Sequence, residues 1–147
     1  MELALRPATD DDYEYLYRLN EATMRTYAEQ TYGPWDETVV QRIFAERWRP
    51  ATIRILVIDG QNAGMLEVLP SETGVHLANI RVAPEYQGRG IGTRLVSEVL
   101  RDAHSRGLPV RLRVLKVNPA RRLYARLGFV VVGETEQHYL MQAFPPA

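Results

Sequence analysis

The sequence contains no cysteine, so it forms no disulfide and has no thiolate nucleophile. It also lacks any apolar run near the roughly 18–20 residues that a membrane-spanning helix needs, and its first residues do not follow the basic-then-apolar order of a signal peptide. We therefore expect a cytoplasmic protein with no membrane partner. The three histidines (His76, His104 and His138) are too scattered for a zinc-ligand pattern, so we expect no metal.

The chain lacks a net charge, with 18 basic and 18 acidic residues, but its charges are segregated along the sequence. Residues 1–87 hold 8 basic and 14 acidic side chains, whereas residues 88–126 hold 10 basic and 2 acidic ones. The later segment therefore favours an anionic ligand, and the earlier one favours a cationic ligand. The basic residues are arginines apart from Lys116, which suits bidentate phosphate contacts or reflects genome composition.

The length of 147 residues and the 46% hydrophobic content predict one globular domain spanning residues 1–147. Short β-branched runs alternate with segments of helical periodicity. The predicted order is strand, two helices, three strands, helix, strand, helix and two strands. We expect an α/β (α+β) fold, in which helices pack on a mixed sheet.

The boundaries of these elements follow from turn and cap residues. A first strand at 3–5 precedes Thr9, which we expect to cap a helix that breaks at Gly33-Pro34. The second helix is predicted from about 36 to 48. Strands follow at 52–58, 63–69 and 75–82, then a helix from 91 to near 107, a strand at 110–117, a helix opened by Asn118-Pro119, and strands at 130–132 and 139–144.

The segment most indicative of chemistry is Gln87-Gly88-Arg89-Gly90-Ile91-Gly92-Thr93, between a strand and a helix. Three alternate glycines let the backbone turn tightly and approach a ligand. Their amides, with the positive end of the following helix, suit a pyrophosphate. A plain strand-to-helix corner would also use glycines. The dinucleotide fingerprint fails because Thr93 replaces its third glycine, and the phosphate-binding loop of nucleotide hydrolases fails because it lacks its lysine.

The same segment resembles the Q/R-x-x-G-x-G/A signature of the GNAT family of acyl-CoA-dependent N-acetyltransferases. The resemblance extends over about 70 residues and includes the strand that precedes the glycines and the run from Asn118 through Tyr124 to Phe129. It implies the GNAT fold: a mostly antiparallel seven-stranded mixed sheet with about four helices and a V-shaped split between strands 4 and 5. It also implies acetyl-CoA as the cosubstrate, and transfer of its acetyl group to a primary amine by direct attack in a ternary complex.

The resemblance implies the cofactor-binding residues position by position. Ile80 and Val82 would offer backbone groups to the pantetheine arm. The amides of Gln87, Gly88, Arg89, Gly90, Ile91, Gly92 and Thr93 would hold the pyrophosphate. Asn118 would contact the cofactor or cap the following helix. One of Arg121, Arg122 and Arg126 would meet the 3′-phosphate.

Two residues are candidates for proton transfer. Tyr124 lies where the family has its general-acid tyrosine, and a phenol stays protonated at neutral pH; the alternative is a packing role. His76 lies on the strand where several members place a glutamate, and histidine can act as a base near neutral pH. Glu67 on the neighbouring strand is the competing base, and ordered water is a third route.

The acceptor is expected to bind near the first two helices, where acidic and aromatic residues suit a small-molecule or peptide amine. Glu29, Tyr32 and Trp35 are the candidate substrate-binding residues. The main alternative function is a non-catalytic acyl-CoA-binding or sensing protein of the same fold. We expect no nucleic acid partner, because no aromatic residues are interleaved with the arginines of the basic segment. The resemblance and the apolar last strand favour a homodimer.

Overall fold

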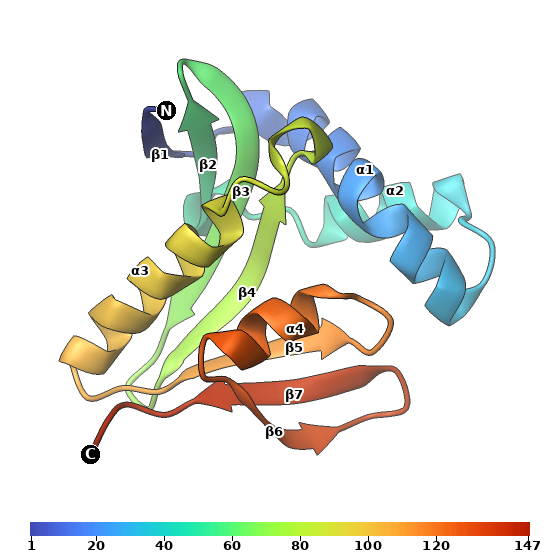
Figure 1. Cartoon of the computed structure of the whole chain (residues 1–147). Helices are drawn as coiled ribbons and strands as arrows, with labels where there is room; N and C mark the ends of the chain where they lie inside the picture. Colours follow the sequence, from blue (N-terminus) through green and yellow to red (C-terminus); the bar gives the residue numbers. More distant parts are fainter. The chain divides into compact units, whose positions relative to one another are not determined.

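The computed structural model describes all 147 residues (Figure 1). The strands are β1 (Leu3–Pro7), β2 (Ile53–Ile58), β3 (Gln61–Pro70), β4 (Val75–Val82), β5 (Val110–Leu115), β6 (Val130–Glu134) and β7 (His138–Ala143). The helices are α1 (Tyr13–Tyr32), α2 (Glu37–Glu46), α3 (Ile91–Ser105) and α4 (Ala120–Arg126). The predicted order of elements is confirmed throughout.

The strands form a seven-stranded mixed sheet in the order β1-β2-β3-β4-β5-β7-β6. The pairs β1–β2, β2–β3, β5–β7 and β6–β7 are antiparallel, whereas β4 and β5 are parallel. The expected fold class is therefore confirmed. The parallel ladder between β4 and β5 consists of two residue pairs, Val75 with Val110 and His76 with Arg111.

The chain divides into two compact units. The first unit comprises residues 1–67 and 79–86, and its core joins α1 to the face of β2 and β3. Leu16 and Leu19 of α1 pack there with Ile55 and Met65, and the side chains of α2 add Phe44. On β3, Gly64 lies so close to Arg81 that a Cβ atom would stand 2.2 Å from its carbonyl oxygen. The close approach of β3 and β4 therefore requires glycine at position 64.

Local sequence signals explain the limits of α1 and α2. Thr9 forms the predicted cap together with Asp12, but the three residues Asp10–Asp12 form a 3₁₀ turn, and α1 begins at Tyr13. A capping box satisfies the amides of this first turn. Gly33, with φ of 94°, ends α1 as predicted, and the side chain of Asp36 caps α2 by accepting a hydrogen bond from the Val39 amide.

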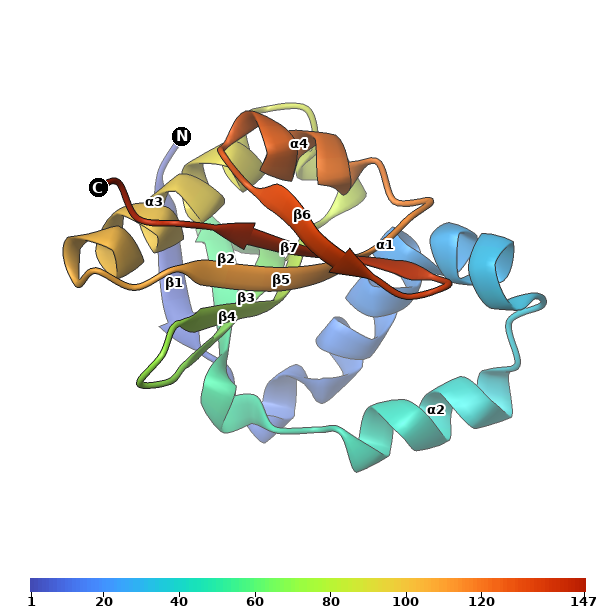
Figure 2. The ribbon, with the colours of Figure 1, turned by 90° about the horizontal axis from the view of Figure 1, so that it is seen from below.

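The second unit comprises residues 68–78 and 87–147. In Figure 2, α3 and α4 lie on the same side of strands β5 and β7. The buried stripe of α3 is the predicted one, with Leu95, Val96, Val99, Leu100 and Ala103 at or below 9% exposure. The helix ends at Ser105 with Gly107 in the left-handed region, and β5 ends two residues earlier than predicted because residues 116–117 form a turn.

Candidate active site

The glycine segment forms the tight strand-to-helix turn that the sequence predicts. Gly88 and Gly90 have φ of 77° and 76°, which is the left-handed region that side chains disfavour. Gly90 is the N-cap of α3 and supplies no side-chain cap. The first-turn amides of a helix have no partner within the helix, and the helix dipole makes this end positive. These residues therefore fit a pyrophosphate group.

Gly92 lacks the positive φ of the two preceding glycines. It lies inside the first turn of α3, and a Cβ atom there would stand 3.4 Å from the Leu123 side chain of α4. That is an ordinary van der Waals distance, so the packing of α3 on α4 does not itself require glycine at position 92. Of the other residues in the segment, Gln87, Arg89 and Thr93 are exposed and Ile91 is buried at 2%.

Tyr124 is buried at 7% exposure within α4, where its ring packs edge to face on Phe129 at 5.7 Å. Just before this helix, the side-chain oxygen of Asn118 accepts a hydrogen bond of 2.9 Å from the Ala120 amide. The N-cap residue is Pro119, so Asn118, which the sequence predicted as a cap, satisfies the first amide of α4 from one position before the N-cap. The packing of Tyr124 fixes the direction of its side chain.

The first unit contains a pocket of about 340 Å³ beside α1 and α2. Its wall includes the aromatic side chains of Trp35, Phe44 and Trp48. Its polar lining consists of Asn20 and Arg47 from the helical part and Glu67, Asn79 and Arg81 from β3 and β4. This combination of an apolar wall and a few polar groups is typical of small-molecule sites.

Glu67 is the only carboxylate of that lining, and it is buried at 9% exposure. One of its oxygens accepts a hydrogen bond of 2.8 Å from the Asn79 amide, and the other accepts one from the Thr52 hydroxyl. Arg81 in turn donates to the side-chain oxygen of Asn79 at 2.9 Å. A carboxylate has about four acceptor positions, so Glu67 keeps capacity for a ligand.

His76, the other candidate base, is exposed on β4 and does not belong to the lining of this pocket. Its parallel partner on β5 is Arg111. Ile80 and Val82 lie further along β4 and are half-buried.

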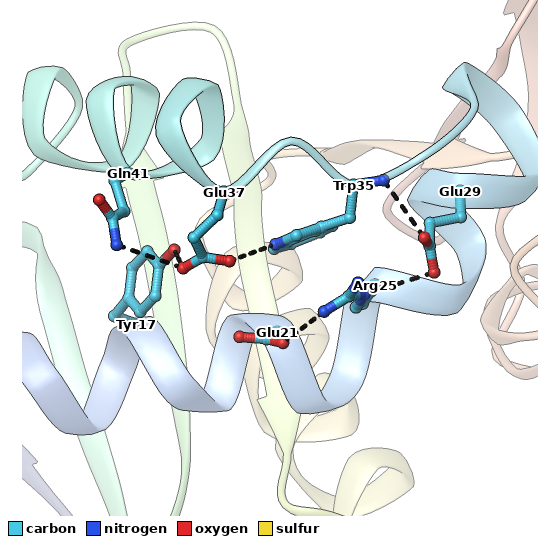
Figure 3. Close-up of polar contacts among 7 residues, drawn as sticks. All are labelled: Tyr17, Glu21, Arg25, Glu29, Trp35, Glu37 and Gln41. Atoms are coloured by element: carbon cyan, nitrogen blue, oxygen red, sulfur yellow. Dashed lines mark hydrogen bonds and ion pairs between the residues drawn. The ribbon is translucent and has the colours of Figure 1, made fainter.

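Of the three candidate substrate-binding residues, two are brought together. The backbone amide of Trp35 donates to Glu29 at 3.2 Å (Figure 3). Trp35 also lines the pocket. Tyr32, at the end of α1, is 64% exposed and does not line the pocket. The chain contains no group of three or more His, Asp or Glu side chains placed to hold a metal ion.

A polar network ties Trp35 to both helices (Figure 3). Glu37 accepts hydrogen bonds from the Tyr17 hydroxyl, from the Trp35 indole at 3.0 Å and from Gln41 at 3.3 Å. The bond from Tyr17 is the main reason that the pKa of Glu37 is lowered. Burial, together with this carboxylate, raises the pKa of Tyr17 to about 12.

The comparison with protein families decides the identity of the fold. The model of the acetyltransferase (GNAT) family matches residues 15–129. The chain belongs to the GNAT acetyltransferase family. The resemblance seen in the sequence is confirmed, and with it the assignment to the N-acetyltransferases.

Two of the proteins similar to this GNAT acetyltransferase have names that state different acceptors. Spermidine N(1)-acetyltransferase from Escherichia coli K12 is 27% identical, over 93% of this chain and 77% of its own length. The structure of PaiA N-acetyltransferase from Thermoplasma acidophilum in complex with coenzyme A has a TM-score of 0.76 at 19% identity, over 98% and 99% of the two chains. The ribosomal-protein-S18-alanine N-acetyltransferase of Escherichia coli has a TM-score of 0.67 at 21% identity, over 99% and 96%.

Sequence reasoning named Glu67 and Trp35 but missed the other polar residues of the pocket in this GNAT domain. Asn79 and Arg81 carried a usable signal, because two polar residues at alternate positions of a strand share one face. Asn20 and Arg47 lie on or beside helices with many polar residues, so nothing in their spacing distinguished them.

Proposed function

We propose that this protein transfers the acetyl group of acetyl-CoA to a primary amine by direct attack within a ternary complex. The observation that carries the proposal is the turn at Gly88 and Gly90 before the α3 N-terminus, because its geometry suits the pyrophosphate of that cosubstrate. When bound, acetyl-CoA supplies the activated acetyl group. Ile80, Val82 and Asn118 remain predictions for its pantetheine arm.

We propose Glu67 as the group that receives the proton of the acceptor ammonium, directly or through one water. Its support is its position in the pocket wall and the two hydrogen bonds that fix its carboxylate. An alkyl ammonium has a pKa of about 10 and is therefore protonated at neutral pH, so its proton must be removed before the amine can attack the thioester. His76 stays the competing prediction.

Tyr124 is proposed to hold the proton that the departing sulfur needs. A phenol with an ordinary pKa of about 10 is protonated at neutral pH and can donate as negative charge develops. The support is the fixed direction of the Tyr124 side chain in α4, together with its match to the position of the family's tyrosine.

The two compact units are proposed to make up one N-acetyltransferase domain, since the family model runs through both. No helix meets the length and hydropathy that a bilayer span requires. The cytoplasmic location and the homodimer stay predictions. For the homodimer, the surface to test is β6, an edge strand on which Val130, Val131 and Val132 are each about half exposed.

A thiol-release assay with acetyl-CoA and a panel of amines tests the proposal. The panel contains polyamines, amino acids and peptide N-termini, and mass spectrometry of the product shows the acetylated amine. We expect release of coenzyme A that depends on one class of acceptor. Tight binding of acetyl-CoA with no release for any acceptor would favour the sensing alternative instead, and absence of binding would contradict both.

A further inference from the structure

We propose that the acceptor is an amine that also carries an anionic group, with Arg47 binding that group; an α-amino acid with an apolar side chain is the smallest member of this class. The inference rests on the proposed function, because it takes the pocket of the first unit as the acceptor site. It goes beyond that function by naming the chemical class of the substrate.

Three glutamates of α1 and α2 are already engaged. Glu37 accepts three hydrogen bonds, and Arg25 binds Glu21 at 2.8 Å and Glu29 at 3.4 Å (Figure 3). None of these glutamates lines the pocket. These three charges are therefore bound within the protein, and Glu67 is the one carboxylate of the pocket lining that can meet the acceptor's ammonium.

The two tryptophans of the pocket offer little to a cation. The indole of Trp35 donates to Glu37, and the indole of Trp48 donates to Asp10 at 2.8 Å. The Arg25 guanidinium already lies 5.5 Å from the ring centroid of Trp35. Arg25 thus already occupies one face of Trp35, and the Trp48 ring packs edge to face with Tyr13 at 4.9 Å. The two tryptophans are therefore suited to contact an apolar part of the acceptor.

The pocket lining itself carries two guanidinium groups against one carboxylate. Arg47 stands at the C-cap of α2, is exposed and makes no ion pair. Arg81 is oriented by its hydrogen bond to Asn79, the same amide group that binds Glu67. A pocket lined by one fixed carboxylate and two guanidinium groups complements an ammonium and an anionic group in one molecule, and a guanidinium binds a carboxylate bidentately.

The size of the pocket agrees with a small acceptor. About 340 Å³ is at the low end for small-molecule sites, and the apolar lining comes from both helices and from β2 and β3. A long polycation such as spermidine, the substrate in the name of the curated relative, would bring its second and third ammonium groups toward Arg47 and Arg81. Like charges in such a cavity disfavour binding.

Matched acceptor pairs test the inference. Leucine, methionine, phenylalanine and tryptophan are compared with their carboxamides and with spermidine, by calorimetric binding in the presence of coenzyme A and by steady-state thiol release. We expect at least one amino acid to bind about tenfold or more tightly than its amide and than spermidine. Amine reactivity alone would favour the amide, because its amine has the lower pKa and is less protonated.

The Arg47→Gln variant and the Arg42→Gln control locate the anion site. Arg42 lies on the same helix, is exposed and does not line the pocket. We expect Arg47→Gln to raise the KM for the preferred amino acid about tenfold, with the KM for its amide and for acetyl-CoA unchanged. Arg42→Gln leaves all three values unchanged.

Several results would overturn the inference. They are equal or better binding of the amides or of spermidine, binding of none of the four amino acids, and an equal effect of Arg47→Gln on an amino acid and its amide. A different result would contradict the proposed function and leave the inference standing. In that result the preference for the amino acid persists in the binding measurement, while no acceptor supports release of coenzyme A.

Discussion

The side-chain amide of Asn79 on β4 donates a 2.8 Å hydrogen bond to the carboxylate of Glu67 on the neighbouring strand β3. With the Thr52 hydroxyl on the other oxygen, this bond fixes a buried acid in the wall of a pocket. A base that is held in this way needs no rearrangement before it accepts a proton.

We expect Glu67→Gln to lower kcat about a hundredfold, because general-base contributions are commonly of that order. The glutamine keeps the size of the side chain and can still bond to Thr52 and Asn79. The measurement is kcat with a saturating acceptor at neutral pH. Glu46→Gln, an exposed acid on α2, is the control. A drop of the same size in His76→Ala, with Glu67→Gln active, would assign the base to the histidine.

Removal of the Tyr124 hydroxyl tests the proposed acid. We expect Tyr124→Phe to lower kcat about a hundredfold while the affinity for acetyl-CoA stays the same, because the ring still packs on Phe129. Tyr139→Phe is the matched control, since that ring packs against Lys116 and Arg121 rather than at the proposed site. Unchanged turnover in Tyr124→Phe would show that the residue serves packing alone.

Alanine variants of two glycines with similar positive φ distinguish an effect on stability from an effect on acetyl-CoA binding. Gly90 and Gly107 have φ of 76° and 72°, one at the start and one beyond the end of α3. Alanine at either position should cost about 1–2 kcal/mol of stability. We expect Gly90→Ala alone to raise the dissociation constant of acetyl-CoA, measured by calorimetry. Equal affinities in the two variants would contradict the pyrophosphate assignment.

Glu37 is predicted to act on the acceptor site through Trp35. Glu37→Gln weakens the hydrogen bonds that hold the Tyr17 hydroxyl and the Trp35 indole, so the pocket wall becomes less ordered. We expect a several-fold rise in the KM of the acceptor with little change in kcat. Glu14→Gln, on an exposed face of α1, should have neither effect. A fall in kcat at constant KM would contradict this positioning role.

The pair of Arg6 and Asp12 should make stability depend on pH in the acid range. Arg6 binds Asp12 at 2.8 and 3.0 Å, and this lowers the pKa of Asp12 below its ordinary value. The unfolded chain therefore binds its proton at a higher pH than the folded chain. The stabilisation is full above the unfolded pKa of about 4 and is lost as the pH falls through the lower folded value.

Urea unfolding at pH 7 and at pH 3 measures this contribution. At pH 7 we expect Asp12→Asn to reduce the free energy of unfolding by about 1–2 kcal/mol, since Arg6 is partly solvated. The difference between the variant and the natural protein should be smaller at pH 3. Asp11→Asn, an exposed neighbour, should match the natural protein at both values. A constant difference would mean that the carboxylate charge is not involved.

The fold could be predicted because its signals are local. The caps at Thr9 and Asp36, the turn at Gly60 and the glycines before α3 determine where elements begin and end, and the alternation of apolar residues determines their type. The shift of α1 to Tyr13 escaped prediction because three acids after a cap suit a 3₁₀ turn and an α-helix equally well.

The candidate site was less predictable because it depends on contacts between distant residues. Glu67 forms hydrogen bonds with Thr52 and Asn79 only when three separate segments have folded together. No spacing of residues in the sequence predicts those hydrogen bonds. The partners of Glu29 were equally hidden. Because the surrounding segment is rich in acids, the sequence gave no indication that Glu29 forms an ion pair with Arg25 and accepts a hydrogen bond from the Trp35 backbone amide.

Trp35 and Trp48 are the only tryptophans in the chain, and both stand in the wall of the pocket. Tryptophan fluorescence, excited selectively over that of the eight tyrosines, therefore originates entirely at the proposed acceptor site. An acceptor that displaces solvent from these rings should shift the emission spectrum, whereas a ligand held only at the glycine turn should leave it unchanged. The natural protein thus carries its own optical reporter, with which acceptor classes can be screened before any turnover is measured.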